Sequence, residues 1–384
     1  MNRPLHRQPS CLAPVLLLAL SATTGCPYTG NNGKNNGDSA VNPLRIETQS
    51  VVSDSGGVIT LSLDVQDGER FQVVQDDGKG GVVFTDSLTD PSGTKVLDWQ
   101  DWQTSKYSYT EAVYGAKYAN TTNWPIREED GPTRGGTWTF VGDTLKSNYS
   151  QKPNEPVDIT IAYRKDADPT HGAVHVIVAY CTGVDSDPEV VRGVEAAVAT
   201  WTQIWAAFGI TLTVDYAEIA LDPALPNTSD GEQAYQDLAA QYDDHPLIEV
   251  IGDSIAGDLT ILGETSAIPG PMAATQITAV EVSWMGHAGG NGNFSDGEIQ
   301  MMGETMAHET GHFLGMFHPV EDGWQYWDYL DDTEDCTNQN TCEADLGSNL
   351  MFPYTICTTF TSCDPQQDLS PKQVGIMLNY VGVE

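Results

Sequence analysis

Three histidines within eleven residues limit what this chain can fold into more than any other feature. Residues 308–318 read H-E-T-G-H-F-L-G-M-F-H. Histidines four residues apart on a helix project from one face, so His308 and His312 can point at one ion. A continuing helix would carry His318 about 15 Å further along its axis, so the chain must turn back before it. Gly315 supplies a residue that can take the positive φ of such a turn.

The spacing of these residues predicts a catalytic metal site. Three histidine nitrogens with an open fourth position are the arrangement of catalytic rather than structural zinc. The sequence therefore predicts Zn²⁺ held by His308, His312 and His318. Glu309 lies beside the first ligand and would be the general base for hydrolysis of a peptide bond. A bare H-E-x-x-H can arise by chance on an amphipathic helix, but the added glycine and third histidine favour the metal site.

The helix that carries the first two histidines has clear start and stop signals. Residues 295–298 read S-D-G-E, a capping box with Ser295 as N-cap. The expected helix ends near Gly315, and its apolar positions are Ile299, Met302, Met306, Phe313 and Leu314.

These residues resemble the metzincin clan of zinc peptidases. The clan's second mark is a Met-turn that places a methionine beneath the metal, and residues 349–354, N-L-M-F-P-Y, fit it with Met351. Ordinary core packing is the other interpretation of this methionine. The resemblance implies an α/β (α+β) catalytic domain over residues 166–384, with a mixed twisted sheet, an active-site helix and a Met-turn. It also implies that the strand at 277–284 is the sheet edge that pairs with substrate.

Two families within the clan compete. The pappalysins are similar in residues 329–333, in the paired cysteines that follow, and in the L-S-P-x-Q-V run at 369–374. The matrixins are similar in the L-M-F-P turn at 350–353. We favour a pappalysin-like protein. The resemblance implies Tyr354 as an oxyanion donor, although pappalysin-like turns usually place this tyrosine two residues after the methionine rather than three.

The N-terminus has the features of a targeting segment. Residues 1–25 combine two arginines with a short apolar run, as in a signal peptide. The small residues before Cys26 resemble a bacterial lipoprotein cleavage site, with Cys26 as the lipidated residue, and plain secretory cleavage is the alternative. Residues 26–43 are rich in Asn and Gly, as in a flexible tether. We therefore expect an extracytoplasmic protein, lipid-anchored to a bacterial membrane at the outer membrane or cell surface, or secreted.

The charge of the chain excludes one class of partner. The formal net charge is −37, and an acidic surface of this kind repels nucleic acid. It is also consistent with bound Ca²⁺ or a saline habitat. The best local cluster for an ion is Asp331, Asp332, Glu334 and Asp335. A solvated acidic loop is the simpler interpretation, because calcium needs six to eight converging oxygens.

The cysteines favour an oxidising compartment. Four of them flank residues 349–354, namely Cys336, Cys342, Cys357 and Cys363. They could form two disulfides with three connectivities. Bridges that cross the turn would hold it beneath the metal. Cys181 is left over at the end of an apolar run and is expected to be a buried free thiol.

The chain before residue 166 predicts a separate β-sandwich-like domain over residues 44–165. Alternating runs at 58–65, 137–141 and 157–163 predict strands. The domain would be an accessory or pro-domain. Residues 140–143, F-V-G-D, resemble a pro-segment motif of the astacins whose aspartate caps the zinc, but Gly-Asp in an ordinary turn after a strand is the favoured interpretation.

Residues 166–384 alternate strand and helix patterns. Strands are expected at 174–180, 211–216 and 247–251, and a helix from 190 to 208 that Gly209 ends. Ser370 and Pro371 predict the start of a closing helix. Taken together, the sequence predicts a zinc-dependent endopeptidase acting on peptides or proteins. The alternative is a surface-anchored binding lipoprotein with an inactive metalloprotease-like domain, which the intact Glu309 disfavours.

Overall fold

The computed structural model describes residues 44–78, 81–99, 107–108, 119–165, 170–225, 233–242, 244–272, 279–288, 293–328, 330–356 and 365–384. These residues belong to one compact unit. The expected signal peptide (1–25), the tether (26–43) with Cys26, and Cys357 and Cys363 lie outside the described residues. Within the described part, no helix is long and apolar enough to cross a membrane.

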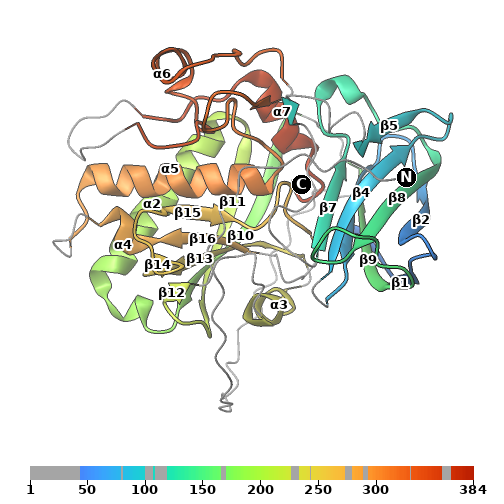
Figure 1. Cartoon of the computed structure of the whole chain (residues 1–384). Helices are drawn as coiled ribbons and strands as arrows, with labels where there is room; N and C mark the ends of the chain where they lie inside the picture. Colours follow the sequence, from blue (N-terminus) through green and yellow to red (C-terminus); the bar gives the residue numbers. More distant parts are fainter. Residues whose placement is uncertain are drawn as a thin grey trace, which may run out of the picture. The chain divides into compact units, whose positions relative to one another are not determined.

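Residues 44–165 form two four-stranded antiparallel sheets, one with strand order β1-β9-β3-β7 and one with order β2-β8-β4-β5 (Figure 1). Every second residue of β2 is buried, as its alternating sequence predicts. Both sheets contribute to one hydrophobic cluster, in which Phe71 and Trp138 lie 5.4 Å apart between ring centroids. The expected strands at 58–65, 137–141 and 157–163 are confirmed. The strands are β1 (Arg45–Val52), β2 (Val58–Val65), β3 (Arg70–Asp76), β4 (Val82–Thr89), β5 (Lys95–Asp98), β7 (Ala119–Trp124), β8 (Gly136–Leu145) and β9 (Pro156–Arg164).

The expected turn at Gly142 and Asp143 is wrong. Both residues continue strand β8, where Gly142 pairs with Ile59 and Asp143 pairs with Val58. A Cβ on Gly142 would overlap with Oε1 of Gln75. The glycine therefore makes room for a side chain of β3 in the other four-stranded sheet and does not mark a turn.

A five-stranded sheet organises the second half, with strand order β11-β10-β13-β16-β15. The first four strands are parallel and β15 is antiparallel, so the expected mixed sheet is present. The expected edge strand is wrong, because β16 lies between β13 and β15. The true edge is β15, whose three residues are too few to show an alternating pattern. The strands are β10 (Gly172–Cys181), β11 (Ile210–Ile219), β13 (Leu247–Gly252), β15 (Gly263–Thr265) and β16 (Ala279–Ser283).

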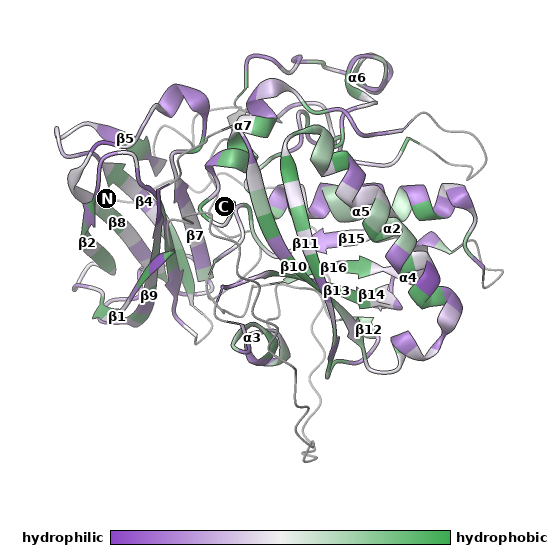
Figure 2. Ribbon diagram, turned by 180° about the vertical axis from the view of Figure 1, so that it is seen from behind, coloured by the Kyte–Doolittle hydropathy of each residue, from purple (hydrophilic) through white to green (hydrophobic). Residues whose placement is uncertain are grey.

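Two long helices pack against each other and against this sheet, and Figure 1 shows α5 lying along β15 and β16. Helix α2 (Pro188–Ala207) ends before Gly209, whose φ is +81°, as predicted. Its two tryptophans, Trp201 and Trp205, are fully buried and belong to the core. Figure 2 shows hydrophobic colouring on strands of this half and a mixture of hydrophobic and hydrophilic colouring along α2 and α5.

Helix α5 (Asp296–Phe313) begins at the predicted capping box, in which Ser295 and Glu298 satisfy each other's backbone N–H groups. The remaining helices and short strands are α3 (Gln233–Ala239), α4 (Trp284–His287), α6 (Gln339–Leu346), α7 (Pro371–Asn379), η1 (Glu128–Asp130), η2 (Val184–Ser186), β6 (Tyr107–Ser108), β12 (Ala224–Leu225), β14 (Ser254–Ile255) and β17 (Trp327–Asp328). Ser370 and Pro371 start α7 as predicted.

Side chains of the first half bond main-chain groups of the second. Gln72 donates to the carbonyl of Gly270 (2.9 Å) and accepts from the amide of Met272 (2.7 Å). Arg70 donates to the carbonyls of Leu378 and Val383. Since Gln72 is fully buried, these bonds are shielded from water and costly to leave unmade.

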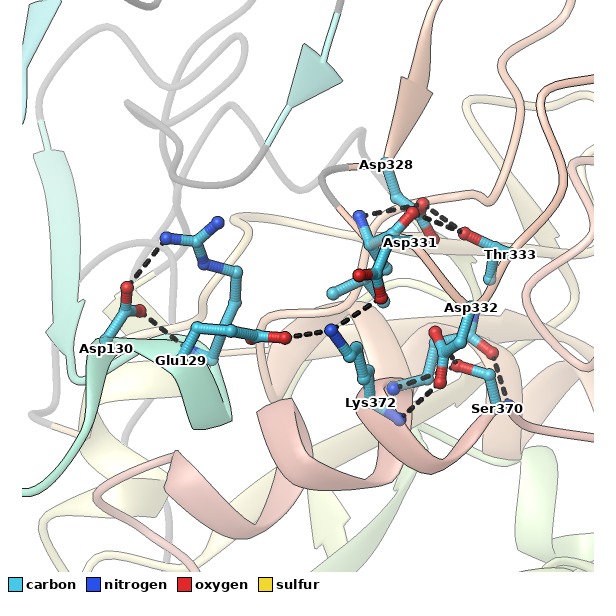
Figure 3. Close-up of polar contacts among 11 residues, drawn as sticks. Glu129, Asp130, Asp328, Asp331, Asp332, Thr333, Ser370 and Lys372 are labelled. Atoms are coloured by element: carbon cyan, nitrogen blue, oxygen red, sulfur yellow. Dashed lines mark hydrogen bonds and ion pairs between the residues drawn. The ribbon is translucent and has the colours of Figure 1, made fainter.

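Two of the four acidic residues considered as an ion site, Asp331 and Asp332, have other partners (Figure 3). Asp331 pairs with the Lys372 ammonium at 2.5 Å, and Lys372 also binds Glu129 of η1. Asp332 accepts from the Ser370 hydroxyl (2.8 Å) and from the backbone N–H of Lys372 (2.9 Å). A carboxylate at the first turn of a helix is stabilised by the helix dipole. Asp332 therefore stabilises the start of α7, and Asp331 pairs with a side chain of the same helix. No observation on the described residues supports the suggested calcium.

The structure selects one of the three connectivities that the sequence left open, and it is the one without a bridge across residues 349–354. Cys336 bonds Cys342, six residues later and on the same side of that segment. The chain turns into α6 between them and brings their Cα atoms to 5.2 Å, the usual spacing for a disulfide. Cys181 is the predicted buried free thiol, and burial raises its pKa to about 12.

Candidate metal centre

The three predicted ligands converge. Nε2 of His318 lies 3.0 Å from Nε2 of His312 and 3.3 Å from Nε2 of His308. A tetrahedral zinc with Zn–N bonds of about 2.0–2.1 Å separates its ligand nitrogens by about 3.4 Å. Among the described residues, these histidines form the group of side chains close enough to hold one metal ion.

Gly315 makes this convergence possible. Helix α5 ends at its C-cap Leu314, and Gly315 adopts φ +105°. Its amide bonds the carbonyl of His312 at 2.8 Å, which closes the turn. The chain then reverses and brings His318 back to the helix, as the sequence predicts.

Each ligand ring is oriented by a hydrogen bond from its other nitrogen. Nδ1 of His308 donates to the carbonyl of Leu350 (2.7 Å), and Nδ1 of His312 donates to the carbonyl of Met316 (2.7 Å). Nδ1 of His318 donates to Oε2 of Glu321 (2.9 Å). These acceptors fix the proton on Nδ1 and leave the Nε2 lone pairs directed at one another. The sequence did not reveal Glu321 as a partner of the site.

The environment keeps two of the histidines neutral. Burial lowers the pKa of His308 to about 3 and holds that of His312 well below its usual range. For His318, burial lowers the pKa, but the carboxylates of Glu321 and Glu309 together outweigh it and the net shift is upward. Neutral imidazole is the form that binds a metal.

Glu309 lies in an environment that suits a base. Burial raises the pKa of its carboxyl to about 7, near the value at which a general base works best. The Thr265 hydroxyl lies 2.8 Å from its Oε2 and 2.6 Å from its carbonyl oxygen. A Cβ on Gly263 would lie 2.5 Å from Cγ of Glu309, so glycine allows β15 to approach the base. Neither residue was singled out from the sequence.

Met351 lies against the helix between the two helical ligands. It is fully buried, and a Cβ on Gly311 would lie 2.7 Å from its sulfur. Its amide bonds the side chain of Asn349 at 2.9 Å, and Leu350 beside it accepts from His308. The segment that contains Met351 thus contacts both the helix and one ligand.

Tyr354 has a partner outside the histidine group. Its hydroxyl donates to Oε1 of Glu343 on α6 at 2.8 Å. Burial and this carboxylate raise its pKa to about 12. The ring packs against Phe352, with 5.0 Å between centroids. A role as oxyanion donor stays a prediction and would require the hydroxyl to leave Glu343.

The donor set fits zinc. Three imidazole nitrogens with fixed tautomers leave one tetrahedral position for a substrate or a water molecule. A carboxyl with a pKa near neutrality lies beside them. Such an arrangement can activate water and polarise a carbonyl, which is the chemistry of metal-assisted hydrolysis.

Comparison with known proteins finds likeness in structure alone. No family model and no curated protein matches the sequence. Solved structures of metal-dependent peptidases show partial similarity, each at 14% identity. Archaemetzincin from Methanopyrus kandleri matches 39% of this chain and 76% of its own, with a TM-score of 0.27. Metalloproteinase-II from Bacteroides fragilis matches 47% and 54% (TM-score 0.27), and myroilysin 53% and 90% (TM-score 0.25). Because these TM-scores are low, the function of the site is argued below from its own geometry.

Proposed function

We propose that this protein is a zinc-dependent endopeptidase. The observation that carries the proposal is the convergence of His308, His312 and His318 through Nε2, with every Nδ1 engaged elsewhere and Glu309 adjacent. A structural zinc site would close the fourth position with another protein ligand. Here the group of candidate ligands among the described residues numbers three.

The residues of the chain would divide the work of hydrolysis as follows. Zinc bound to the three histidines supplies Lewis acidity, which acidifies water and polarises the scissile carbonyl. Glu309 accepts the proton of the attacking water and returns it to the leaving nitrogen, because the proton must move to the amine for the bond to break. Thr265 holds the carboxylate in place. Among the described residues β15 is an edge strand of the sheet and lies beside Glu309, where an extended peptide can pair through its main chain.

The finer classification is also part of the proposal. The histidine pattern, Gly315 and the position of Met351 against Gly311 are what support a metzincin with Met351 in a Met-turn. The pappalysin-like assignment rests on the sequence runs at 329–333 and 369–374. The β-sandwich-like half is assigned as an accessory or pro-domain. Cys26 as a lipid anchor, with an extracytoplasmic location, rests on the N-terminal sequence.

One experiment separates this function from a binding protein with an inactive site. The full chain and its Glu309→Gln variant are assayed for zinc content and for cleavage of casein and of a peptide library. We expect one zinc per chain in both and cleavage by the wild type alone. Glu304→Gln, the same chemical change on the same helix, is the control and should cleave normally.

Equal cleavage by wild type and Glu309→Gln would overturn the assigned mechanism. A wild type that binds zinc without cleaving any peptide would favour the binding protein. A wild type without zinc at neutral pH would overturn the metal site.

A further inference from the structure

We infer that Glu321 is the positioning residue for the third metal ligand, and that its carboxylate sets how tightly the site holds zinc. This inference rests on the proposed metal site and deepens it. Glu321 Oε2 lies 2.9 Å from Nδ1 of His318. Among the three ligands, only His318 has a side chain rather than a main-chain carbonyl as its Nδ1 partner.

The third ligand needs such a partner because it is not on a helix. His308 and His312 are set by the backbone of α5. His318 lies beyond the turn at Gly315, and 21% of its side chain is exposed. Its ring can therefore rotate unless something outside the backbone holds it. A carboxylate bonded to Nδ1 fixes the ring orientation and makes Nε2 a stronger donor to the metal.

Local structure explains why Glu321 reaches this ring. Residues 319–328 form a small hairpin, in which Val320 pairs with Trp327. The amide of Glu321 bonds the carbonyl of Tyr326 (2.9 Å), and the amide of Trp324 bonds the carbonyl of Glu321 (3.0 Å). Both main-chain groups of Glu321 are thus hydrogen-bonded within the 319–328 hairpin, so the backbone position from which its side chain extends is fixed.

The 319–328 hairpin is itself anchored. Val320 is fully buried in a small hydrophobic cluster with Trp327 and Phe352. The Trp327 indole donates to the carbonyl of Cys336 (2.9 Å), and Cys336 is in the disulfide with Cys342. A continuous set of contacts therefore runs from the disulfide through the hairpin to Glu321 and the third ligand.

The test measures zinc affinity on the full chain, separately from peptide cleavage. Zinc is removed and titrated back against a chromophoric chelator for wild type, Glu321→Ala and Glu321→Gln. Loss of an outer partner of a metal ligand lowers metal affinity about ten- to hundred-fold, and we expect this loss for Glu321→Ala. Glu321→Gln should lose less, because its amide oxygen still accepts from Nδ1. Asp322→Ala is the matched control, since Asp322 is an exposed neighbour of the same charge.

A second readout distinguishes positioning from general destabilisation. Co²⁺ replaces zinc, and the visible spectrum reports the geometry at the metal. We expect Glu321→Ala to shift this spectrum and Asp322→Ala to reproduce the wild-type one. The thermal midpoints of the metal-free proteins should agree, because 37% of the Glu321 side chain is exposed and its loss leaves no buried cavity.

The inference is overturned if Glu321→Ala keeps the zinc affinity and the cobalt spectrum of the wild type. It is also overturned if Asp322→Ala loses as much zinc affinity as Glu321→Ala. In both cases, peptide cleavage by the wild type would still uphold the proposed function. If the wild type binds zinc, Glu321→Ala binds it more weakly and neither cleaves a peptide, the inference stands and the proposed function fails. A wild type that takes up no metal overturns both.

Discussion

Helix α5 and the 319–328 hairpin hold parts of the same site by different means. The helix places His308 and His312 through its own hydrogen bonds, and main-chain carbonyls orient both rings. The hairpin holds His318 through one carboxylate, and its own core is a small cluster closed by a disulfide. The comparison shows that one site can combine ligands fixed by secondary structure with a ligand fixed by a side chain. We expect His318, the ligand fixed by a side chain, to lose its orientation more easily than His308 and His312.

Opening the disulfide is the strongest way to test this contrast. For the double variant Cys336→Ser/Cys342→Ser we expect a loss of about 2–3 kcal/mol of stability, the value for closing a short loop. Zinc affinity should fall with it, while α5 keeps its structure. Hydrogen exchange would show faster exchange in the 319–328 hairpin and unchanged protection in α5. Cys181→Ala removes a buried thiol from the main core and should leave zinc affinity unchanged.

The turn at Gly315, which joins α5 to the 319–328 hairpin, is expected to give the next largest effect. Gly315 has φ +105°, and a β-branched residue there costs about 1–3 kcal/mol of strain. Gly315→Val should therefore lower the free energy of unfolding in urea and weaken zinc binding. Gly375→Ala is the control, because Gly375 lies within α7 with nothing near its missing Cβ. We expect that change to stabilise the protein by up to about 1 kcal/mol.

The hairpin should also respond to pH through a carboxyl of its own, Asp328, in addition to any contribution from Glu309 on α5. Burial raises the pKa of Asp328 to about 7, and its Oδ2 has no hydrogen-bond partner in the described part of the chain. A carboxyl with a raised pKa stabilises the fold below its unfolded pKa, and that contribution is lost as pH rises through 7. We expect a loss of about 1.4 kcal/mol between pH 6 and 8 from this group, the equivalent of one pKa unit.

Asp328→Asn should remove that part of the pH dependence, as measured by urea unfolding at both pH values. Its side-chain oxygen can still accept from the Thr333 hydroxyl and the Leu330 amide. An unchanged slope between pH 6 and 8 in the variant would mean that another group titrates.

The smallest effect on stability is expected from a change at Met351, which packs against α5. Met351 is fully buried against Gly311. Exchange of methionine for leucine nearly conserves volume and costs less than about 1.5 kcal/mol. Met351→Leu should therefore keep its zinc and most of its stability in thermal unfolding. A complete loss of zinc would show that the sulfur has a role beyond packing.

The helical part of the site could be predicted because its signals are local. The capping box at Ser295, the spacing of His308 and His312, and Gly315 each act within a few residues, and the structure has all of them where expected. The start of α7 at Ser370 and Pro371 was predicted for the same reason.

The parts that escaped prediction depend on distant partners. Glu321 is one of 54 acidic residues, and only the fold brings its carboxylate to His318. Strand β15 has three residues, so it shows no period, and the edge of the sheet was assigned to β16 instead. Gly142 looked like a turn because the side chain it makes room for, Gln75, lies on another strand. Disulfide partners likewise depend on where α6 turns the chain.

The contacts of Arg70 have a consequence for how the chain folds. Its guanidinium binds the carbonyls of Leu378 and Val383, which are 308 and 313 residues later in the sequence. Contacts of such separation form slowly, because a long loop must close first. During synthesis, Arg70 and Gln72 emerge long before their partners exist. Until the second half of the chain is in place, both side chains must satisfy their hydrogen bonds with water instead.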